Sequence, residues 1–499
     1  MSRINTNVQS LTSQRILGQN NTGLNQSLER LSTGLRINRG ADDPAGLIAS
    51  ENLRSEQASI SAAIANAERA DQVVNIAEGG LQEINSLLLE VQGLVGRSAN
   101  DAGLSDEEKA ANQLQIDSIL QTIDRIASAT SFQGTKLLNG TFDFTISAQT
   151  SQVVDFQINA AKLEFGENRD VQVLVTASAQ AAGLFLSLGG TPLDLSSSDA
   201  RFVFEVAGAL GSREFTFASG TALADVATSI NTFTDVTGVS AAVSGGGIRL
   251  DSSELGSDQF VSIDVVTDGG ADGGVAALNS NNSNSAITVG FTNLSAVTNP
   301  VRDEGQDVGA IINGIAATAR GGTASINTDF LDVEINLNTS GSQSLQSLDA
   351  FTITGGGARF NLGPNVDIIN QVSVGIENVA SRNLGSLTNG FLDDLGSSRS
   401  ANVEDGDLGQ AQSIVNDAIG QLSSLRGRLG AFQKNTIGAT IRSLGVALEN
   451  TSAAESAIRD TDFAAETAEL TRSQILVNAS TSVLGIANNQ PQSVLSLLG

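Results

Sequence analysis

A long series of apolar residues that starts at Ile60 has the spacing of a coiled coil. Its steps are 4-3-4-3-3-4-3-4-3-4, a heptad with one slip, and Asp71 is its single polar member. A heptad of this length is more typical of a coiled coil than of an ordinary surface helix. Just before it, Asp43 can cap a helix and Pro44 suits a first helical position, so the pattern predicts a helix over residues 44–98. The core positions predicted on this helix are Ile60, Ile64, Val74, Leu81, Ile84 and Leu88.

The C-terminal part of the chain repeats this pattern. From Ala418 the apolar steps are 4-3-4-3 to Phe432, and after a skip of five residues they continue 4-3-4 from Ile437. A skip of this kind locally changes a supercoil. We interpret both series mainly as the core of a helical bundle within one subunit, with another helix expected over about 105–130. The core positions predicted here are Leu422, Leu425, Leu429, Phe432, Ile441 and Leu444.

Both ends of the chain carry amphipathic stripes of opposite charge. Residues 1–40 hold five Arg and one Glu, whereas residues 455–499 hold two Arg and five acidic residues. Exposed ion pairs contribute only about 0–1 kcal/mol each, so we expect the apolar stripes to supply most of the pairing energy and the charges to help choose the partner. The predicted interface positions are Ile4, Val8, Leu11, Leu24, Leu28, Leu31, Leu35, Phe463, Leu470, Val477, Leu484, Val494, Leu495, Leu497 and Leu498. The last twelve residues hold no charge, and a soluble protein rarely leaves such a tail in water.

The middle of the chain, about 141–400, has the pattern of β-strands. It holds most of the 19 Phe and many Gly, and polar and apolar residues alternate in 201–217 and 351–362. Short helices are expected at 222–233 and 305–313. Two small β-rich lobes that divide near residues 280–300 fit this segment better than a single one.

Composition narrows the chemistry. The chain of 499 residues has a net charge of −27 and contains no His and no Cys, so the usual general base, the thiolate nucleophile and the usual zinc ligands are missing. The acidic pairs Asp393/Asp394 and Glu404/Asp405 lie among Gly and Ser, where solvated loops explain them better than a carboxylate-based active site. The sequence therefore indicates no enzyme and no cofactor, and its negative charge disfavours nucleic acid and anionic membranes as partners.

The start of the chain lacks the apolar segment of a signal peptide. No stretch approaches the roughly 20 apolar residues that span a membrane. The glycine runs at 245–247 and 355–357 lack the spacing of a phosphate-binding loop, and hairpin turns account for them better. The protein either stays inside the cell or leaves by a route that reads no such signal.

The two ends resemble one known family. The segments SLERLSTGLRIN and ADDPAG near the start, and AIRDTDFAAETAELTRSQILVNASTSVL near the end, resemble the terminal patterns of bacterial flagellin, the subunit of the flagellar filament. The resemblance covers roughly residues 1–140 and 405–499. A weaker one, over FVFEVAGALGSREFTF and the residues after it, is to the flagellin hook "IN" motif.

The resemblance implies an α+β multidomain fold, in which a long antiparallel helical coiled-coil rod from the N- and C-terminal regions carries β-rich outer lobes inserted between them. The terminal arms would pair in the innermost layer of a tube, where copies of the chain bury the apolar tail in a helical homopolymer. The expected divisions are an N-terminal arm (1–43), a rod segment (44–150), a β-rich lobe with the IN-type motif (151–290), a second β-rich segment (291–404), a rod segment (405–455) and a C-terminal arm (456–499).

The resemblance also implies partners. These are an export chaperone, the filament cap and the junction proteins, with the chain secreted to the extracellular flagellum through its growing channel and no signal peptide cleaved. The hook–filament junction protein, which has similar arms, is the alternative within this class. Family members are recognised by a vertebrate innate receptor through an Arg, a Leu and a Glu. Here Leu94 matches the Leu, but Glu90 and Gln115 stand at the other two positions, so we expect weak receptor activation.

Overall fold

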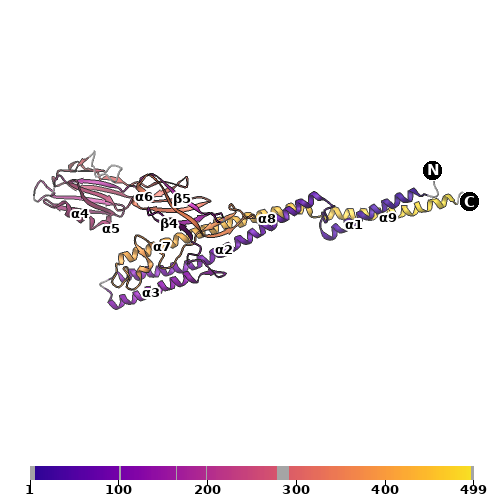
Figure 1. Ribbon diagram of the computed structural model, residues 1–499, viewed down its shortest axis with the longest axis horizontal. Helices are drawn as coiled ribbons and strands as arrows, with labels where there is room; N and C mark the ends of the chain where they lie inside the picture. Colours follow the sequence, from indigo (N-terminus) through magenta and orange to yellow (C-terminus); the bar gives the residue numbers. More distant parts are fainter. Residues whose placement is uncertain are drawn as a thin grey trace. The chain divides into compact units, whose positions relative to one another are not determined.

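The computed structural model describes residues 6–100, 103–164, 166–190, 192–197, 199–277 and 291–495. The chain forms two compact units. The first unit contains Met1–Gln72, Asn361–Asn370 and Ala431–Gly499, and the second contains Val73–Phe360 and Gln371–Gly430. Figure 1 labels some of the elements, and each unit is described by itself below.

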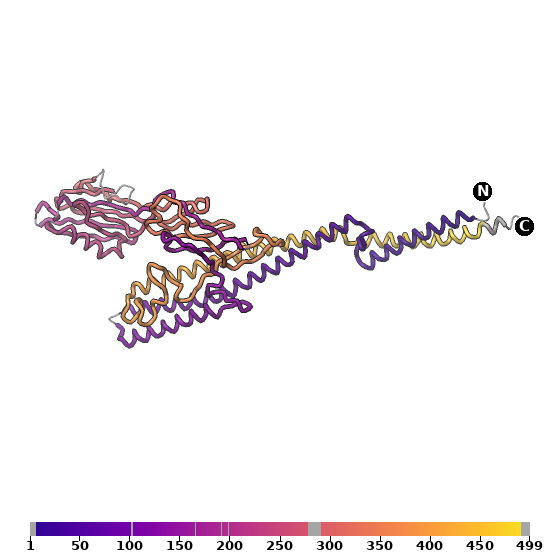
Figure 2. The backbone as a smooth tube through the Cα atoms, in the orientation of Figure 1, coloured from indigo at the N-terminus to yellow at the C-terminus, as the bar shows by residue number. Residues whose placement is uncertain are grey.

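The first unit is helical apart from its connectors. Helices α1 (Val8–Thr33) and α9 (Phe463–Leu495) lie side by side, the indigo and yellow ends of the chain in Figure 2. The unit also holds α8 (Gly438–Arg459) and the part of α2 (Pro44–Ser98) up to Gln72. As predicted, α2 begins at Pro44, and Asp43 caps it, because the Asp43 carboxylate accepts a hydrogen bond from the Gly46 N–H at 2.9 Å.

The five-residue skip in the C-terminal heptad falls on a π-helical segment. This segment, η3 (Phe432–Ile437), joins α7 (Leu408–Ala431) to α8. One π-turn holds an extra residue, so it absorbs the skip within a continuous helix. The polar member of the first series, Asp71, also has a partner, since its carboxylate accepts a hydrogen bond from the Gln433 amide at 2.9 Å.

The helical part of the second unit contains the rest of α2, α3 (Asp106–Ala129) and α7. Ser105 begins α3 with a capping box to Glu108. Arg426 of α7 pairs with Glu78 of α2 at 2.8 Å, and the Gln92 amide donates to Asn416 at 2.9 Å. The residue number rises from Glu78 to Gln92 along α2 and falls from Arg426 to Asn416 along α7, so the two helices are antiparallel.

Among its described residues, the β-rich part of the second unit contains four larger antiparallel sheets with two hydrophobic cores. The strands between residues 182 and 304 build two of them. One has the order β13 (Thr292–Asn293), β12 (Gly274–Ala277), β6 (Gly183–Ser187), β10 (Gly247–Ser252), β9 (Val239–Ser244), and the other has the order β14 (Val301–Glu304), β11 (Phe260–Thr267), β7 (Arg201–Gly208), β8 (Ser212–Ala218). Their shared core includes Phe202, Phe204 and Ile248.

The second core draws its strands from both sides of that segment. Its sheets have the orders β16 (Ile315–Ala316), β15 (Gly309–Ile312), β5 (Arg169–Ala177), β20 (Ser347–Gly356), β3 (Phe144–Ser147) and β17 (Thr318–Arg320), β18 (Thr323–Asn327), β19 (Leu331–Leu337), β4 (Val153–Ala161). One β-rich lobe is therefore inserted into the other. This differs from the consecutive division near residues 280–300 that the sequence predicted, because β5 pairs with the distant β15 and β20.

Shorter elements complete the second unit. The two-stranded sheets are β1 (Ser131–Phe132) with β2 (Thr135–Lys136), β21 (Ala358–Asn361) with β22 (Gln371–Val374), and β23 (Gly385–Ser386) with β24 (Gly390–Phe391). The short helices are α4 (Leu223–Asn231), α5 (Thr234–Thr237), α6 (Thr339–Gln343), η1 (Leu294–Ala296) and η2 (Leu392–Leu395).

Most of the local predictions in this region are confirmed. The segments 201–217 and 351–362 form strands, and α4 lies where a helix was expected. Gly245 and Gly246, with φ of 52° and 85°, make the turn between β9 and β10. The helix predicted at 305–313 is wrong. The alternating side chains of Val308, Ala310 and Ile312 are buried, and β15 pairs with β5 there, so the period of two decides the structure.

Candidate assembly interface

Helices α1 and α9 form an antiparallel pair joined by polar contacts along its length. The Asn7 amide donates to the Ala487 carbonyl at 2.7 Å, and the Ser10 hydroxyl donates to the Asn488 side chain at 2.6 Å. Further along, the Asn20 amide donates to the Ser480 hydroxyl at 2.7 Å. The predicted pairing of the two arms is therefore present in the described residues.

Small side chains form the buried seam between these helices. Its buried members are Ser10, Ser13, Ser27, Ser473, Ser480 and Ala487. Small residues let two helix backbones approach closely, and hydroxyls can satisfy one another there. The sequence analysis assigned most of the pairing energy to the apolar stripes, and that assignment stays a prediction, since part of each stripe is half-buried in the pair.

Several large apolar side chains of the arms are exposed to solvent in the pair. Val8 and Leu11 are 62% and 59% exposed, and Phe463 is 57% exposed. Leu28 is also exposed, while Leu24, Leu31, Leu35, Leu470, Val477 and Leu484 are half-buried. Val494 and Leu495 end α9, and Ile4, Leu497 and Leu498 lie outside the described residues.

Several exposed apolar residues were missed by the sequence analysis. They are Ile16, Ile475, Leu476, Val483 and Ile486, the last of which is 71% exposed. They lie outside the heptad series that was followed in each arm, and a search for apolar residues on the opposite helix faces would have found them. Near the chain ends, Val8, Thr12, Val483, Ile486 and Ala487 line an open groove of about 700 Å³.

The side chains at the predicted rod positions are more buried than those at the predicted interface positions of the arms. In the second unit Val74, Leu81, Ile84, Leu88, Leu422, Leu425 and Leu429 are buried. In the first unit Ile60 is buried, and Ile64, Phe432, Ile441 and Leu444 are half-buried. The helical part of the second unit therefore has a core of large aliphatic side chains, whereas the buried side chains in the described part of the α1–α9 pair are Ser and Ala.

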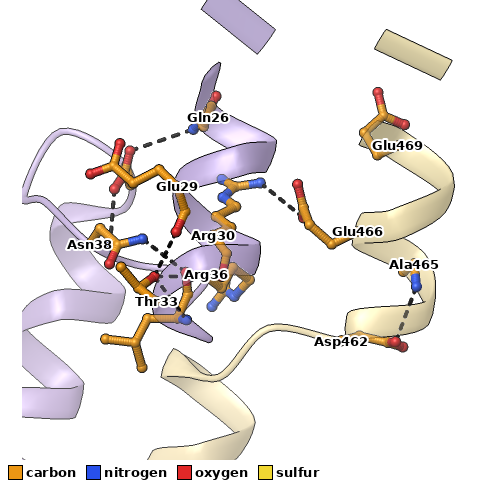
Figure 3. Close-up of polar contacts among 12 residues, drawn as sticks. Gln26, Glu29, Arg30, Thr33, Arg36, Asn38, Asp462, Ala465, Glu466 and Glu469 are labelled. Atoms are coloured by element: carbon orange, nitrogen blue, oxygen red, sulfur yellow. Dashed lines mark hydrogen bonds and ion pairs between the residues drawn. The ribbon is translucent and has the colours of Figure 1, made fainter. Parts of the chain in front are cut away.

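A polar junction lies at the base of the α1–α9 pair, defined as the end where α1 stops and α9 begins (Figure 3). Arg30 of α1 points toward Glu466 of α9, with 3.6 Å between guanidinium and carboxylate. Just beyond, Leu35 and Asp460 form an isolated antiparallel bridge. In the connector to α2, N–H groups of Arg39 and Asn38 donate to the Asp42 carboxylate and hold its pKa below the usual range.

The predicted receptor positions differ in exposure. Leu94 is fully buried in the isolated chain, and Glu90 and Gln115 are exposed. A leucine in this state cannot offer its side chain to a partner without a change in the surrounding helices.

A second cavity, of about 480 Å³, lies in the second unit and is lined by Asp143, Asp155, Glu377 and apolar side chains. Burial, together with the nearby Glu377 carboxylate, raises the pKa of Asp143 to about 6, although the Phe144 N–H donates to it at 2.8 Å. Arg428 pairs with Glu377 at 2.7 Å. Among the described residues, no group of three or more acidic side chains is arranged to hold a metal ion.

Within the described ranges, no helix combines the length and the apolar character needed to cross a bilayer. The acidic pairs of the sequence analysis have local structural contacts. Asp393 pairs with Arg399 at 2.7 Å, and Asp394 accepts a hydrogen bond from the Phe391 N–H. The backbone N–H groups of Glu404 and Asp405 both donate to the Asn402 side chain.

Three family models match the chain. They describe the bacterial flagellin N-terminal helical region at residues 4–143, the bacterial flagellin C-terminal helical region at residues 412–498, and the flagellin hook IN motif at residues 201–254.

Curated relatives match along nearly the whole length. The chain is 30% identical to B-type flagellin of Pseudomonas aeruginosa and 28% identical to flagellin B of Helicobacter pylori, with 99% of each chain covered in both cases. Among solved structures, the flagellar hook-associated protein 3 of Legionella pneumophila is similar with a TM-score of 0.28 and 12% identity, over 81% of this chain and 97% of that one.

Proposed function

This chain belongs to the bacterial flagellin family and is a structural subunit of the flagellar filament, and from that premise we propose that its terminal arms assemble by burying their outer apolar faces between copies. One observation carries the proposal. The α1–α9 pair buries small residues inside and leaves Val8, Leu11, Phe463 and Ile486 exposed outside. A face of this kind on a homopolymer subunit is suited to contact another copy.

The energetics favour folding that is coupled to assembly. An isolated helix is marginal in water, and the seam of small residues offers the α1–α9 pair little apolar burial of its own. Each large side chain that a neighbour covers contributes roughly 1.5–3 kcal/mol, which can offset the ordering entropy of the arms. We therefore infer that the arms are largely disordered in the monomer and become ordered in the polymer. A contact between different faces of two copies whose rotation does not close gives an open helical filament.

The predicted divisions complete this proposal. Arms 1–43 and 456–499 would form the inner layer, segments 44–150 and 405–455 the rod around it, and the β-rich region 151–404, with one lobe inserted into the other, the outside. The exposed and half-buried interface positions of the arms, and the tail at Val494, Leu495, Leu497 and Leu498, would be covered by neighbouring copies.

Deletion of residues 488–499 tests the proposal. We expect a soluble, partly helical monomer that no longer polymerises, because the deletion removes the apolar tail and one side of the pair near the groove. Circular dichroism and sedimentation of seeded assembly reactions measure both properties. As a control, the substitution Val243→Ser removes an exposed apolar side chain of the β-rich part and should leave assembly unchanged. Filaments of normal yield from the truncated chain would contradict the proposal.

The filament is an extracellular structure of the bacterium, and the route to it is part of the proposal. We infer that the chain leaves the cell unfolded, through the channel of the growing flagellum, with no signal peptide cleaved. An export chaperone, the filament cap and the junction proteins would be its partners. The absence of Cys is compatible with this route, because no disulfide can form before the chain is threaded.

The filament subunit is favoured over the hook–filament junction protein. The relatives named as flagellins match over 99% of the chain, and no feature of the described residues favours the junction protein. We also propose that the chain has no enzymatic activity. The helix-capping, ion-pair and backbone contacts of its acidic pairs support that proposal.

Weak activation of the vertebrate innate receptor is proposed as well. Leu94 is buried, and Glu90 places a negative charge where the family has an Arg. The substitution Glu90→Arg should raise the signal in a cell reporter assay by restoring one contact. Full-strength signalling by the unchanged chain would contradict the proposal.

A further inference from the structure

The seam between α1 and α9 does not by itself fix how the two helices are aligned along their axes. Its buried members on α9 are Ser473, Ser480 and Ala487, which recur every seven residues. Shifting α9 by seven residues, about 10 Å along its axis, would again place a small side chain at two of these positions, with Ser480 in place of Ala487 and Ser473 in place of Ser480. The packing of the seam therefore distinguishes these two alignments weakly.

The polar contacts in the middle of the seam repeat in the same way. In the observed alignment the Asn20 amide donates to the Ser480 hydroxyl at 2.7 Å. In the shifted alignment Ser473 would take the place of Ser480 and offer an identical hydroxyl. This hydrogen bond would thus be available in both alignments.

The junction at the base of the pair distinguishes them. Gly34, in the left-handed region with φ of 76°, ends α1, and the Asp462 carboxylate starts α9 by accepting hydrogen bonds from the N–H groups of Ala464 and Ala465. Between these caps, the Arg36 N–H donates to the Arg459 carbonyl at 2.7 Å, and the Thr461 N–H donates to the Gly34 carbonyl at 2.9 Å. Because the caps fix where each helix ends, this bridge fixes the two ends against each other.

The ion pair of Arg30 with Glu466 joins the two helices next to these backbone hydrogen bonds. The two side chains are only 26% and 12% exposed, and one carboxylate oxygen of Glu466 is buried with no hydrogen-bond partner among the described residues. Both charges also suit their positions, since Arg30 lies in the last turn of α1 and Glu466 in the first turn of α9.

The shifted alignment would separate this pair. Gly23 now lies beside Ser473, since a Cβ placed on Gly23 would be 3.9 Å from the Ser473 hydroxyl. A seven-residue shift would bring Glu466 to that position, opposite a glycine and away from Arg30. A largely buried carboxylate without its cation is strongly unfavourable.

We propose that the junction clasp, defined as Gly34–Arg36 with Arg459–Thr461 and the Arg30–Glu466 pair, sets the alignment of the two terminal arms. Arg30 and Glu466 act as positioning residues. The inference rests on the proposed function, because the alignment decides which apolar side chains the paired arms present together to another copy. It goes beyond that function by assigning the choice of alignment to the base of the pair and not to its seam.

Engineered cysteines can report the alignment, because the chain has no Cys of its own. The pair Ser10→Cys with Asn488→Cys reports the observed alignment, since these side chains are 2.6 Å apart. The pair Ser10→Cys with Thr481→Cys reports the shifted one. After mild oxidation of assembled filaments, a bond within one chain changes the mobility of the monomer on a denaturing gel, whereas a bond between copies gives dimers.

The test compares the two reporters in charge variants. With Arg30 and Glu466 intact, the 10–488 bond should dominate. Arg30→Gln and Glu466→Gln should each lower the ratio of the 10–488 bond to the 10–481 bond by about fivefold or more, as expected for loss of one partner of a largely buried pair. The double reversal, Arg30→Glu with Glu466→Arg, should recover part of the ratio, because each reversed charge faces an unfavourable helix end.

Arg39→Gln is the matched control. It removes an Arg–Glu pair of the same region, Arg39 with Glu29 at 3.0 Å, in which Arg39 is well exposed. We expect it to leave the ratio unchanged. Ratios that stay at the starting value in both Arg30→Gln and Glu466→Gln would overturn the proposal.

Assembly itself is the readout if a single variant does not enter filaments. If the double reversal restores incorporation of the chain into filaments, the result supports the clasp. If the double reversal does not restore it, the result overturns the proposal. Failure of the proposed function would look different, because the reporter chains with the native charges would then form no filaments at all.

Discussion

The α1–α9 pair and the helical part of the second unit use opposite arrangements of the same residue types. In the second unit the large aliphatic side chains of Leu81, Leu88 and Leu425 are buried. In the α1–α9 pair Ser and Ala are buried, while Val8 and Ile486 are exposed. The first arrangement completes a core within one chain. The second leaves large apolar side chains exposed, as the proposed burial by another copy requires, so the two helical regions have different requirements for stability.

The largest expected effect tests the completed core. Leu425→Ala removes a fully buried side chain and should lower the free energy of unfolding of the monomer by about 2–5 kcal/mol, through lost burial and the cavity it leaves. Denaturant unfolding followed by circular dichroism measures it. The matched arm variant Leu28→Ala, at an exposed position, should change this value by less than about 0.5 kcal/mol. Equal losses in the two variants would remove the contrast between the regions.

A smaller effect is expected at the exposed face of the arms. Ile486→Ser should leave the monomer's unfolding unchanged and raise the critical concentration for assembly by about tenfold or more, because the contribution of one buried Ile, roughly 1.5–3 kcal/mol, is lost only in the polymer. Sedimentation at a series of protein concentrations gives the critical value. Ile315→Ser in the β-rich part is the control, since Ile315 is also exposed and lies outside the arms. An unchanged critical concentration for Ile486→Ser would mean that this face stays in water.

The helices could be predicted from the sequence because their signals are local and long. The bounds of α2 follow from Pro44 and a sustained heptad, and the π-segment η3 falls where the heptad skips. The exposure of the apolar stripes could not be predicted, because a stripe shows that a face is buried but not by which molecule. The small residues of the seam give only a weak periodic signal.

The arrangement of the β-rich part was also beyond local patterns. The strand character of 201–217 is visible in the sequence, but the pairing of β5 with β15 and β20 joins residues far apart in the chain. Alternation identifies a strand and gives no information on its partner. The segment 305–313 shows the limit of the local signal, because a short apolar run fits a helix and a buried strand equally well.

The smallest effect concerns a charge inside the second unit. Burial raises the pKa of Asp143 to about 6, so between about pH 4 and 6 the folded chain keeps a proton that the unfolded chain has released. Stability from this group therefore falls as pH rises through that window and stays low above it. Asp143→Asn removes this loss. The free energy of unfolding at pH 7 minus that at pH 4 should therefore be about 1–2 kcal/mol larger in the variant than in the unchanged chain, a figure that already allows for the partial exposure of Asp143 to solvent. Denaturant unfolding at the two pH values measures the difference.

Asn383→Ala is the control for this measurement, because Asn383 lines the same cavity and does not titrate. It should change stability equally at both pH values. A difference that survives in Asp143→Asn would assign the pH dependence to other groups of the unit, with Asp155, whose pKa is also raised by burial, as the next to test. In the described part of the arms, the largely buried Glu466 carboxylate faces the Arg30 cation, whereas Asp143 lies near the Glu377 carboxylate. We therefore expect Asp143→Asn to change the pH dependence of monomer unfolding and to leave the critical concentration for assembly unchanged. That result would separate the stability of the second unit from the assembly of the arms.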